Sequence, residues 1–138
     1  MADTADLEAR LIRVPIFGQL SRRQLKKLLG KAKTTSHSAG QDITEQDKGS
    51  LAFHLVLSGS ADVTVHGKKV RTLGPGEYFG EISMIDGRPR SATVTAASPL
   101  TTLAVPHLAF QNLLDDEPEV ARQLLVRLCD RLREAEAD

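Results

Sequence analysis

Between Gly74 and Val94 the chain carries residues whose types and spacing suit the binding of an anion. Gly80 lets the backbone approach a ligand closely, and residues 82–85 can form one helical turn whose free N–H groups point at a phosphate. Arg90 supplies a fixed positive fork for the same phosphate, and the hydroxyl of Ser91 adds a donor. The segment therefore predicts a phosphate-binding site.

Glu81 lies inside this group and carries the wrong charge for a phosphate. An ionised carboxylate only accepts hydrogen bonds, so its natural target is a nearby pair of sugar hydroxyls. A ligand with both an anionic phosphate and a ribose hydroxyl satisfies the whole set. Phe79-Gly80-Glu81 alone is more typical of an ordinary turn between strands, and only its separation from Pro89-Arg90-Ser91-Ala92 favours binding.

The segment resembles the phosphate-binding cassette of the cyclic-nucleotide-binding domain family. The family pattern is Phe-Gly-Glu, a few apolar residues, and then Pro-Arg-Ser/Ala-Ala-Thr-Val, which residues 79–81 and 89–94 meet. The resemblance implies that Glu81 binds the ribose 2′-hydroxyl and Arg90 the cyclic phosphate, with backbone N–H groups of Ile82, Ser83 and Ala92 completing the cradle. It favours cAMP over cGMP, because Ser91 stands where cGMP-selective relatives often have Thr.

The resemblance covers nearly the whole chain. Further matches are Pro15-Ile16-Phe17 before a capped helix, Gly40 before Ile43, Gly59, and the pair Gly74/Gly76. One departure is Gln46, where the family commonly has Gly before Asp, so the turn there is expected to differ. The implied fold is an eight-stranded β-roll with helices on its ends, and the helix after the roll closes over the base near Leu132, Ala135 and Glu136.

Helical patterns occupy the two ends of the chain. Thr4 and Asp3 can cap a helix over residues 5–13, and Ser21 with Gln24 forms a capping box for a helix over residues 22–29 that Gly30 stops. Pro106 suits the first turn of a helix over residues 107–114, and Pro118 opens a last helix that reaches almost to the C-terminus. The last helix carries an apolar stripe that must find a partner surface: Val120, Leu124, Leu128 and Leu132.

Strand patterns fill the middle of the chain. Short β-rich runs separated by Gly and Pro lie at 35–38, 51–58, 61–66, 69–73, 91–97 and 99–105, and Gly67-Lys68 is a tight hairpin signal. Their spacing suits an antiparallel barrel or jelly roll. The sequence thus predicts one α+β domain over residues 1–138, an antiparallel β-roll (double-stranded jelly roll) flanked by N- and C-terminal helices.

The amino-acid composition argues against several classes of protein. Equal numbers of basic and acidic residues, 18 each, leave no overall field for nucleic-acid binding, and the few aromatic side chains supply no stacking platform. The single cysteine excludes an internal disulfide and fits a reducing compartment, so a cytoplasmic location is expected. No apolar run approaches the length of a membrane span, which argues against export and insertion.

Other candidate sites have plainer interpretations. The four histidines, His37, His54, His66 and His107, show no metal-ligand spacing and are typical of strand or helix-start residues, so no metal is expected. Cys129 has no nearby histidine base and is expected to pack against the leucines around it. Between Arg10 and Lys33 stand eight basic and no acidic residues, which we interpret as a solvated helix face with Leu25, Leu28 and Leu29 turned inward, rather than a patch for a partner or a membrane.

The resulting prediction is a non-enzymatic sensor that binds a cyclic nucleotide, cAMP before cGMP, and signals to an unidentified effector protein by moving its terminal helices. The alternative is a ligand-free protein-interaction module on the same β-roll. A transcription factor would need a DNA-binding helix-turn-helix after the last helix, and the chain stops at Asp138. The last helix also permits a homodimer across a two-fold axis.

Overall fold

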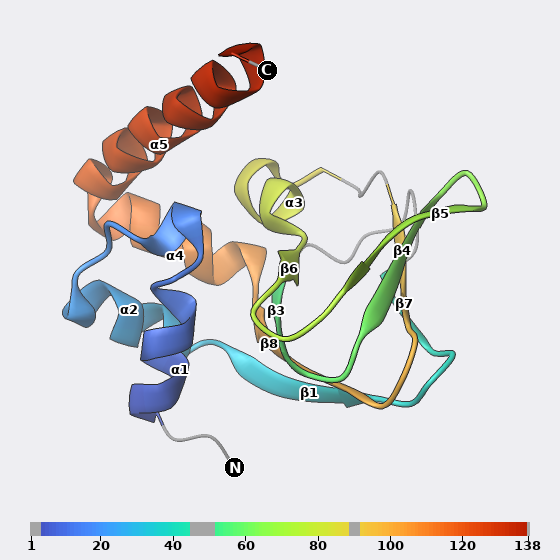
Figure 1. Cartoon of the computed structure of the whole chain (residues 1–138). Helices are drawn as coiled ribbons and strands as arrows, with labels where there is room; N and C mark the ends of the chain where they lie inside the picture. Colours follow the sequence, from blue (N-terminus) through green and yellow to red (C-terminus); the bar gives the residue numbers. More distant parts are fainter. Residues whose placement is uncertain (1–3, 45–51, 89–91, 138) are drawn as a thin grey trace. The chain divides into compact units, whose positions relative to one another are not determined.

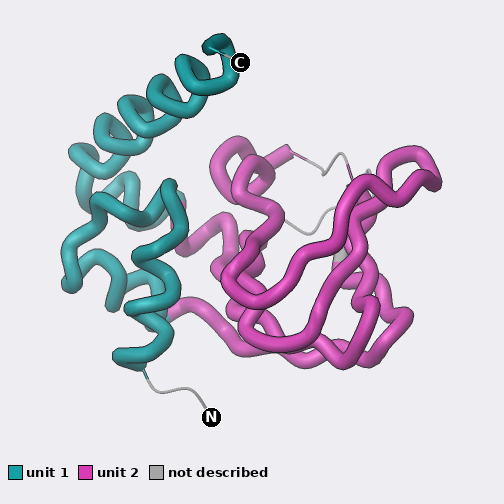
Figure 2. The backbone as a smooth tube through the Cα atoms, in the orientation of Figure 1, with its two compact units in different colours: residues 1–30, 111–138 teal, residues 31–110 magenta. Residues whose placement is uncertain are grey.

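The computed structural model describes residues 4–44, 52–88 and 92–137. The chain forms two compact units (Figure 2), a helical one of residues 1–30 and 111–138 and a strand-rich one of residues 31–110. The candidate site lies in the strand-rich unit. That the whole chain is one domain stays a prediction.

The strand-rich unit consists of two antiparallel four-stranded sheets in its described part (Figure 1). One sheet has the order β1-β8-β3-β6 and the other the order β2-β7-β4-β5. The strands are β1 (Lys33–His37), β2 (Asp42–Thr44), β3 (Phe53–Ser58), β4 (Ala61–Val65), β5 (Lys68–Leu73), β6 (Tyr78–Phe79), β7 (Thr93–Ala96) and β8 (Leu100–Val105). The predicted α+β fold with a two-sheet β-roll is confirmed.

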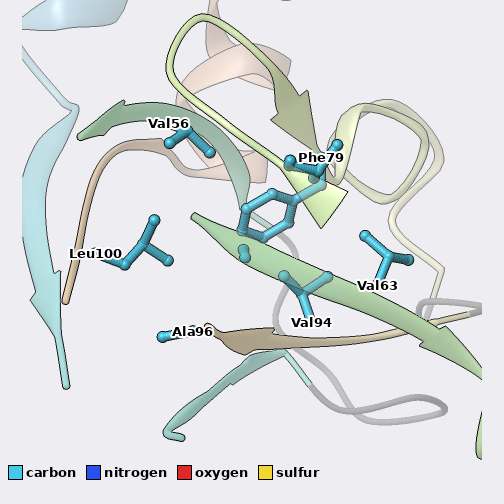
Figure 3. Close-up of a cluster of buried hydrophobic side chains, with 8 residues drawn as sticks. Val56, Val63, Phe79, Val94, Ala96 and Leu100 are labelled. Carbon is cyan, nitrogen blue, oxygen red and sulfur yellow. The ribbon is translucent and has the colours of Figure 1, made fainter. Parts of the chain in front are cut away.

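A buried apolar cluster joins the two sheets. Val56, Phe79 and Leu100 come from the first sheet, and Val63 and Val94 from the second. Figure 3 shows these side chains pointing toward one another, with the ring of Phe79 between them. Alternate residues of a strand point to opposite faces, so Asp62 and Thr64 of β4 and Thr93 and Thr95 of β7 point away from this cluster.

The predicted strands are confirmed to within a few residues, and two short ones were missed. β2 and β6 have three and two residues, too few for an alternating pattern to show. The hairpin turn was placed one residue late: Lys68 already pairs with Val65, and the turn consists of His66 and Gly67. Both turn residues have positive φ, 52° and 77°, as a two-residue hairpin turn of type I′ requires.

The helical unit begins with α1 (Thr4–Leu11), the 3-10 helix η1 (Pro15–Phe17) and α2 (Arg22–Leu29). α2 has the predicted bounds and capping box: Ser21 Oγ accepts from the N–H of Gln24 (3.2 Å), and the Gln24 side chain accepts from the N–H of Ser21 (2.8 Å). α1 ends two residues before the predicted end at residue 13. Arg13 and Val14 bond to carbonyls three residues back, so the chain tightens ahead of Pro15.

The C-terminal helices are α4 (His107–Asp116), close to its predicted range, and α5 (Pro118–Ala137), which begins at Pro118 as predicted. Val120 and Leu124 of the apolar stripe are buried, whereas Leu132 is 62% exposed. Cys129 is exposed too, so its predicted packing role is wrong. A helix of this length extends about 30 Å, and its apolar pattern continues beyond its buried first turns. No helix in the described part is long and apolar enough to span a membrane.

The basic stretch between Arg10 and Lys33 does more than form a solvated helix face, because two of its cations pair with a buried carboxylate. Glu117, 7% exposed, accepts hydrogen bonds from Arg23 and from Gln24 and lies 3.3 Å from the ammonium of Lys27. The hydrogen bonds from Arg23, and next from Gln24, lower the pKa of Glu117 to about 2. Arg23 and Lys27 of α2 therefore pair with Glu117, which lies between α4 and α5.

Candidate functional site

A cavity of about 300 Å³ opens in the strand-rich unit, at the low end of the usual range for small-molecule sites. Its wall combines side chains of β4, β5, β6 and β7 with the short helix α3 (Glu81–Asp86) and the residues around it. The lining residues are Val63, Arg71, Phe79, Gly80, Glu81, Ile82, Ser83, Asp86, Arg88, Ala92 and Val94.

The residues at the start of α3 line this cavity. Gly80 has φ 86°, a left-handed conformation that glycine adopts without strain, and it turns the chain from β6 directly into α3. The first helical hydrogen bond runs from Met84 N–H to the Gly80 carbonyl (3.0 Å). The N–H groups of Glu81, Ile82 and Ser83 consequently have no acceptor within the helix.

The cavity combines three kinds of surface. The backbone donors of α3 suit an anion, the half-buried carboxylate of Glu81 suits hydroxyl donors, and Val63 and Val94 provide an apolar floor. Such a site can hold a small molecule that has a phosphate, a sugar hydroxyl and a flat apolar body. Within the described residues, no three His, Cys, Asp or Glu side chains come together in a way that could hold a metal ion.

The structure brings five of the ten predicted site residues to one cavity: Gly80, Glu81, Ile82, Ser83 and Ala92. Arg90 and Ser91 lie outside the described residues, as does Gln46, the departure from the family pattern. Leu132, Ala135 and Glu136 are exposed residues of α5 in the helical unit and are not among the residues that line the cavity.

Six lining residues were not predicted: Val63, Arg71, Phe79, Asp86, Arg88 and Val94. Val63 is the partner of both Val94 and Arg71, so these three form one row across β7, β4 and β5. The hairpin pattern alone could have predicted that Val63 lies opposite β5. It could not have identified Arg71 as the partner, because the pairing of β4 with β5 shifts register between Val63 and Thr64. Asp86 accepts a hydrogen bond from the N–H of Arg88 (2.9 Å) and fixes the chain after α3.

Phe79, directly before Gly80, is fixed by its packing against β3. Its ring stacks on the imidazole of His54 with centroids 4.9 Å apart and an interplanar angle of 9°. His54 is buried, and its Nδ1 lies 2.9 Å from the hydroxyl of the buried Thr102. The end of β6 therefore pairs with and packs on β3, whose His54 is in turn hydrogen-bonded to β8, and these contacts fix where α3 begins.

Comparison with known proteins identifies the family of this chain. The family model "Cyclic nucleotide-binding domain" matches residues 34–117. A cAMP-dependent protein kinase regulatory subunit of Eremothecium gossypii is 34% identical over 110 residues, which is 79% of this chain and 24% of that protein. A cyclic nucleotide-gated potassium channel of Mesorhizobium japonicum is 33% identical over 108 residues, 78% of this chain and 30% of the channel.

A solved structure has a similar fold. The N-terminal domain of a transcriptional regulator from Streptomyces coelicolor A3(2) superposes with a TM-score of 0.81 at 28% identity, covering 93% of both chains. This chain spans only about a quarter to a third of the length of the curated relatives it matches.

Proposed function

Since the chain belongs to the cyclic nucleotide-binding domain family, we propose that it is a non-enzymatic regulatory module that binds a cyclic nucleotide, cAMP before cGMP, and signals by moving its terminal helices. The observation that carries this proposal is that Gly80, Glu81, Ile82 and Ser83, at the start of α3, line one cavity together with Ala92. A cyclic nucleotide offers the phosphate, the ribose hydroxyl and the flat base that these surfaces suit.

In the proposed complex, the cyclic phosphate accepts hydrogen bonds from the N–H groups of Ile82 and Ser83, and Arg90 neutralises its charge. The 2′-hydroxyl of the ribose donates to Glu81. Ser91 and the N–H of Ala92 complete the phosphate site. Ala92 lines the cavity together with residues of α3. It directly follows residues 89–91, which the structure does not describe.

Two reported relatives support a regulatory output. One is a regulatory subunit of a cAMP-dependent kinase and the other a cyclic nucleotide-gated channel. We propose that this module likewise passes its ligand state to an effector protein, through α5. Exposed apolar side chains of α5, Leu125, Val126 and Leu132, form the contact surface, and a homodimer through the same face is the alternative that sedimentation would detect. A cytoplasmic location stays a prediction.

Isothermal titration calorimetry with cAMP, cGMP and linear AMP tests the ligand. We expect micromolar or tighter binding of the cyclic nucleotides and weaker binding of AMP, whose open phosphate carries an additional charge and a different shape. A folded protein that binds none of the three would contradict the proposal and leave the protein-interaction module as the better interpretation.

A further inference from the structure

The strand β1 forms an unpaired edge of its sheet. It pairs with β8 on one side, and no described residue pairs with its other side. Figure 1 shows β1 at the lower margin of the strand-rich unit. Alternate residues of an edge strand direct their main-chain N–H and C=O groups away from the sheet. The edge of β1 therefore offers a row of donors and acceptors to a further strand.

The other three sheet edges in the described part of the chain each carry a feature that opposes such pairing. β6 has two residues and leads directly into α3, and β2 has three residues and an irregular register. β5 is longer, but its pairing with β4 shifts register, and it carries three cations, Lys68, Lys69 and Arg71. Short strands, bulges and charged side chains are common means by which proteins prevent edge-to-edge association.

β1 has none of these protections beyond one lysine. Its register against β8 is regular over all five residues, from Lys33 opposite Ala104 to His37 opposite Leu100. The strand contains no proline, and its two threonines favour the extended conformation. The edge of β1 is therefore regular and carries a single lysine as its only strong charge.

Contacts on one face of β1 hold the strand in place. The hydroxyl of Thr35 lies 2.8 Å from that of the buried Thr102 in β8 and 3.0 Å from Nε2 of His37. Thr34 and Ser36 alternate with these residues, so they point to the opposite face, and both are exposed. Because the strand is already ordered, a partner that adds to its edge pays little further conformational entropy.

The sequence of β1 suits pairing with a second copy of itself. Two copies can pair antiparallel about a two-fold axis at Thr35, which places Thr34 opposite Ser36 of the second copy and Lys33 opposite its His37. No two lysine or arginine side chains of the strands then lie opposite each other. The same pairing of β5 with its own copy would gather the three cations of each strand along one seam.

We propose that two copies of this chain associate through their β1 strands, antiparallel and about a two-fold axis. The two sheets of order β1-β8-β3-β6 then form one continuous sheet of eight strands. An interface of this size gives a weak, reversible dimer. The ligand cavity stays accessible, because its lining residues belong to β4, β5, β6, β7 and the segment around α3.

Sedimentation velocity of the full chain, from about 10 μM to about 1 mM, should show a monomer–dimer equilibrium. Thr34→Lys combined with Ser36→Lys places like charges opposite each other twice, so we expect a dimer dissociation constant raised by roughly 3- to 30-fold. Thr34→Lys combined with Ser36→Glu is the matched control. It changes the same two exposed positions but places opposite charges across the axis, so it should keep the dimer.

A wild-type chain that stays monomeric up to about 1 mM would overturn the proposal. Equal dimerisation of the two double variants would overturn it too, because the β1 edges would then lie apart. Leu132→Glu, at an exposed position of α5, should leave the dimer intact, and a dimer that this change abolishes forms through α5 instead. Each of these results is independent of nucleotide binding, which the calorimetry above tests separately.

Thermal unfolding of both double variants checks their folds, which changes at two exposed positions should leave intact. If either variant does not fold, hydrogen exchange of the wild type decides the question. Exchange in residues 33–37 should slow as the protein concentration rises, because the edge amides gain acceptors in the dimer. Exchange that does not depend on concentration, in a range where sedimentation shows a dimer, would place the interface elsewhere.

Discussion

The imidazole of His107, the first residue of α4, donates a hydrogen bond from Nδ1 to the main-chain carbonyl of Met84 in α3, across 2.5 Å. The ring also packs on Gly87, where an added Cβ would come within 3.2 Å of its atoms. One side chain therefore joins α3, which lines the cavity, to the start of α4.

His107→Ala should loosen this junction. Loss of a half-buried hydrogen bond costs about 1 kcal/mol, so we expect a modest loss of stability, about fivefold faster hydrogen exchange in α3, and a few-fold weaker binding of cAMP. Leu108→Ala is the control, because Leu108 is the exposed next residue of α4. Unchanged exchange in α3 would show that the bond does not restrain the helix.

Arg90→Ala should remove the charge that we propose neutralises the cyclic phosphate. A charge-assisted hydrogen bond of this kind contributes about 1.5 to 3 kcal/mol, so calorimetry should give a Kd for cAMP raised by roughly 10- to 150-fold with the fold retained. Wild-type affinity in a folded Arg90→Ala protein would show that the cassette assignment is wrong.

Glu81→Ala should abolish the recognition of the ribose hydroxyl. The wild-type protein is expected to bind 2′-deoxy-cAMP roughly tenfold or more weakly than cAMP, whereas the variant should scarcely distinguish them because the acceptor is gone. The comparison is made within each protein, which cancels a general loss of affinity. A preference that survives in Glu81→Ala would remove this carboxylate from the site.

The end of α5 should respond to the ligand. We expect hydrogen exchange in residues 125–138 to slow on saturation with cAMP, because a frayed terminal turn gains contacts with the base. Truncation after Arg131 should weaken cAMP binding while leaving the effect of Arg90→Ala in place. Full affinity in the truncated chain, with unchanged exchange in the intact one, would mean that α5 does not cover the base.

Glu117 should make the stability of the fold depend on acidic pH. Its pKa in the folded protein, about 2, lies below the ordinary value of 4.5, so its contribution is complete above about pH 4.5 and is lost as the pH falls toward 2. Urea unfolding at several pH values should show Glu117→Gln losing less stability than the wild type across this range. Glu119→Gln, an exposed neighbour, should keep the wild-type dependence.

Local sequence signals predicted the elements that local interactions stabilise. Ser21 and Gln24 satisfy each other's backbone donors, so the start of α2 follows from four consecutive residues. Gly80 and Glu81 reach the cavity wall because a short motif turns the chain at the end of β6.

Features that depend on pairing between strands could not be predicted in the same way. Arg71 reaches the cavity because of a bulge opposite Val63, and nothing in the pattern of β5 reveals that register shift. The two-residue strand β6 exists through its pairing with His54 and Leu55. On α5 the apolar stripe correctly indicated a helix, but its spacing cannot say that burial ends near Leu124.

The exposed thiol of Cys129 gives this protein a ready attachment point for a spectroscopic probe. The chain has a single cysteine, and it lies on α5 outside the cavity wall, so a maleimide dye or nitroxide would attach at one known position without mutagenesis. A second label on the β4–β5 turn, attached through His66→Cys, would then test by a measured distance whether α5 moves. Titration with nucleotide would show whether this distance depends on the ligand in solution, one molecule at a time.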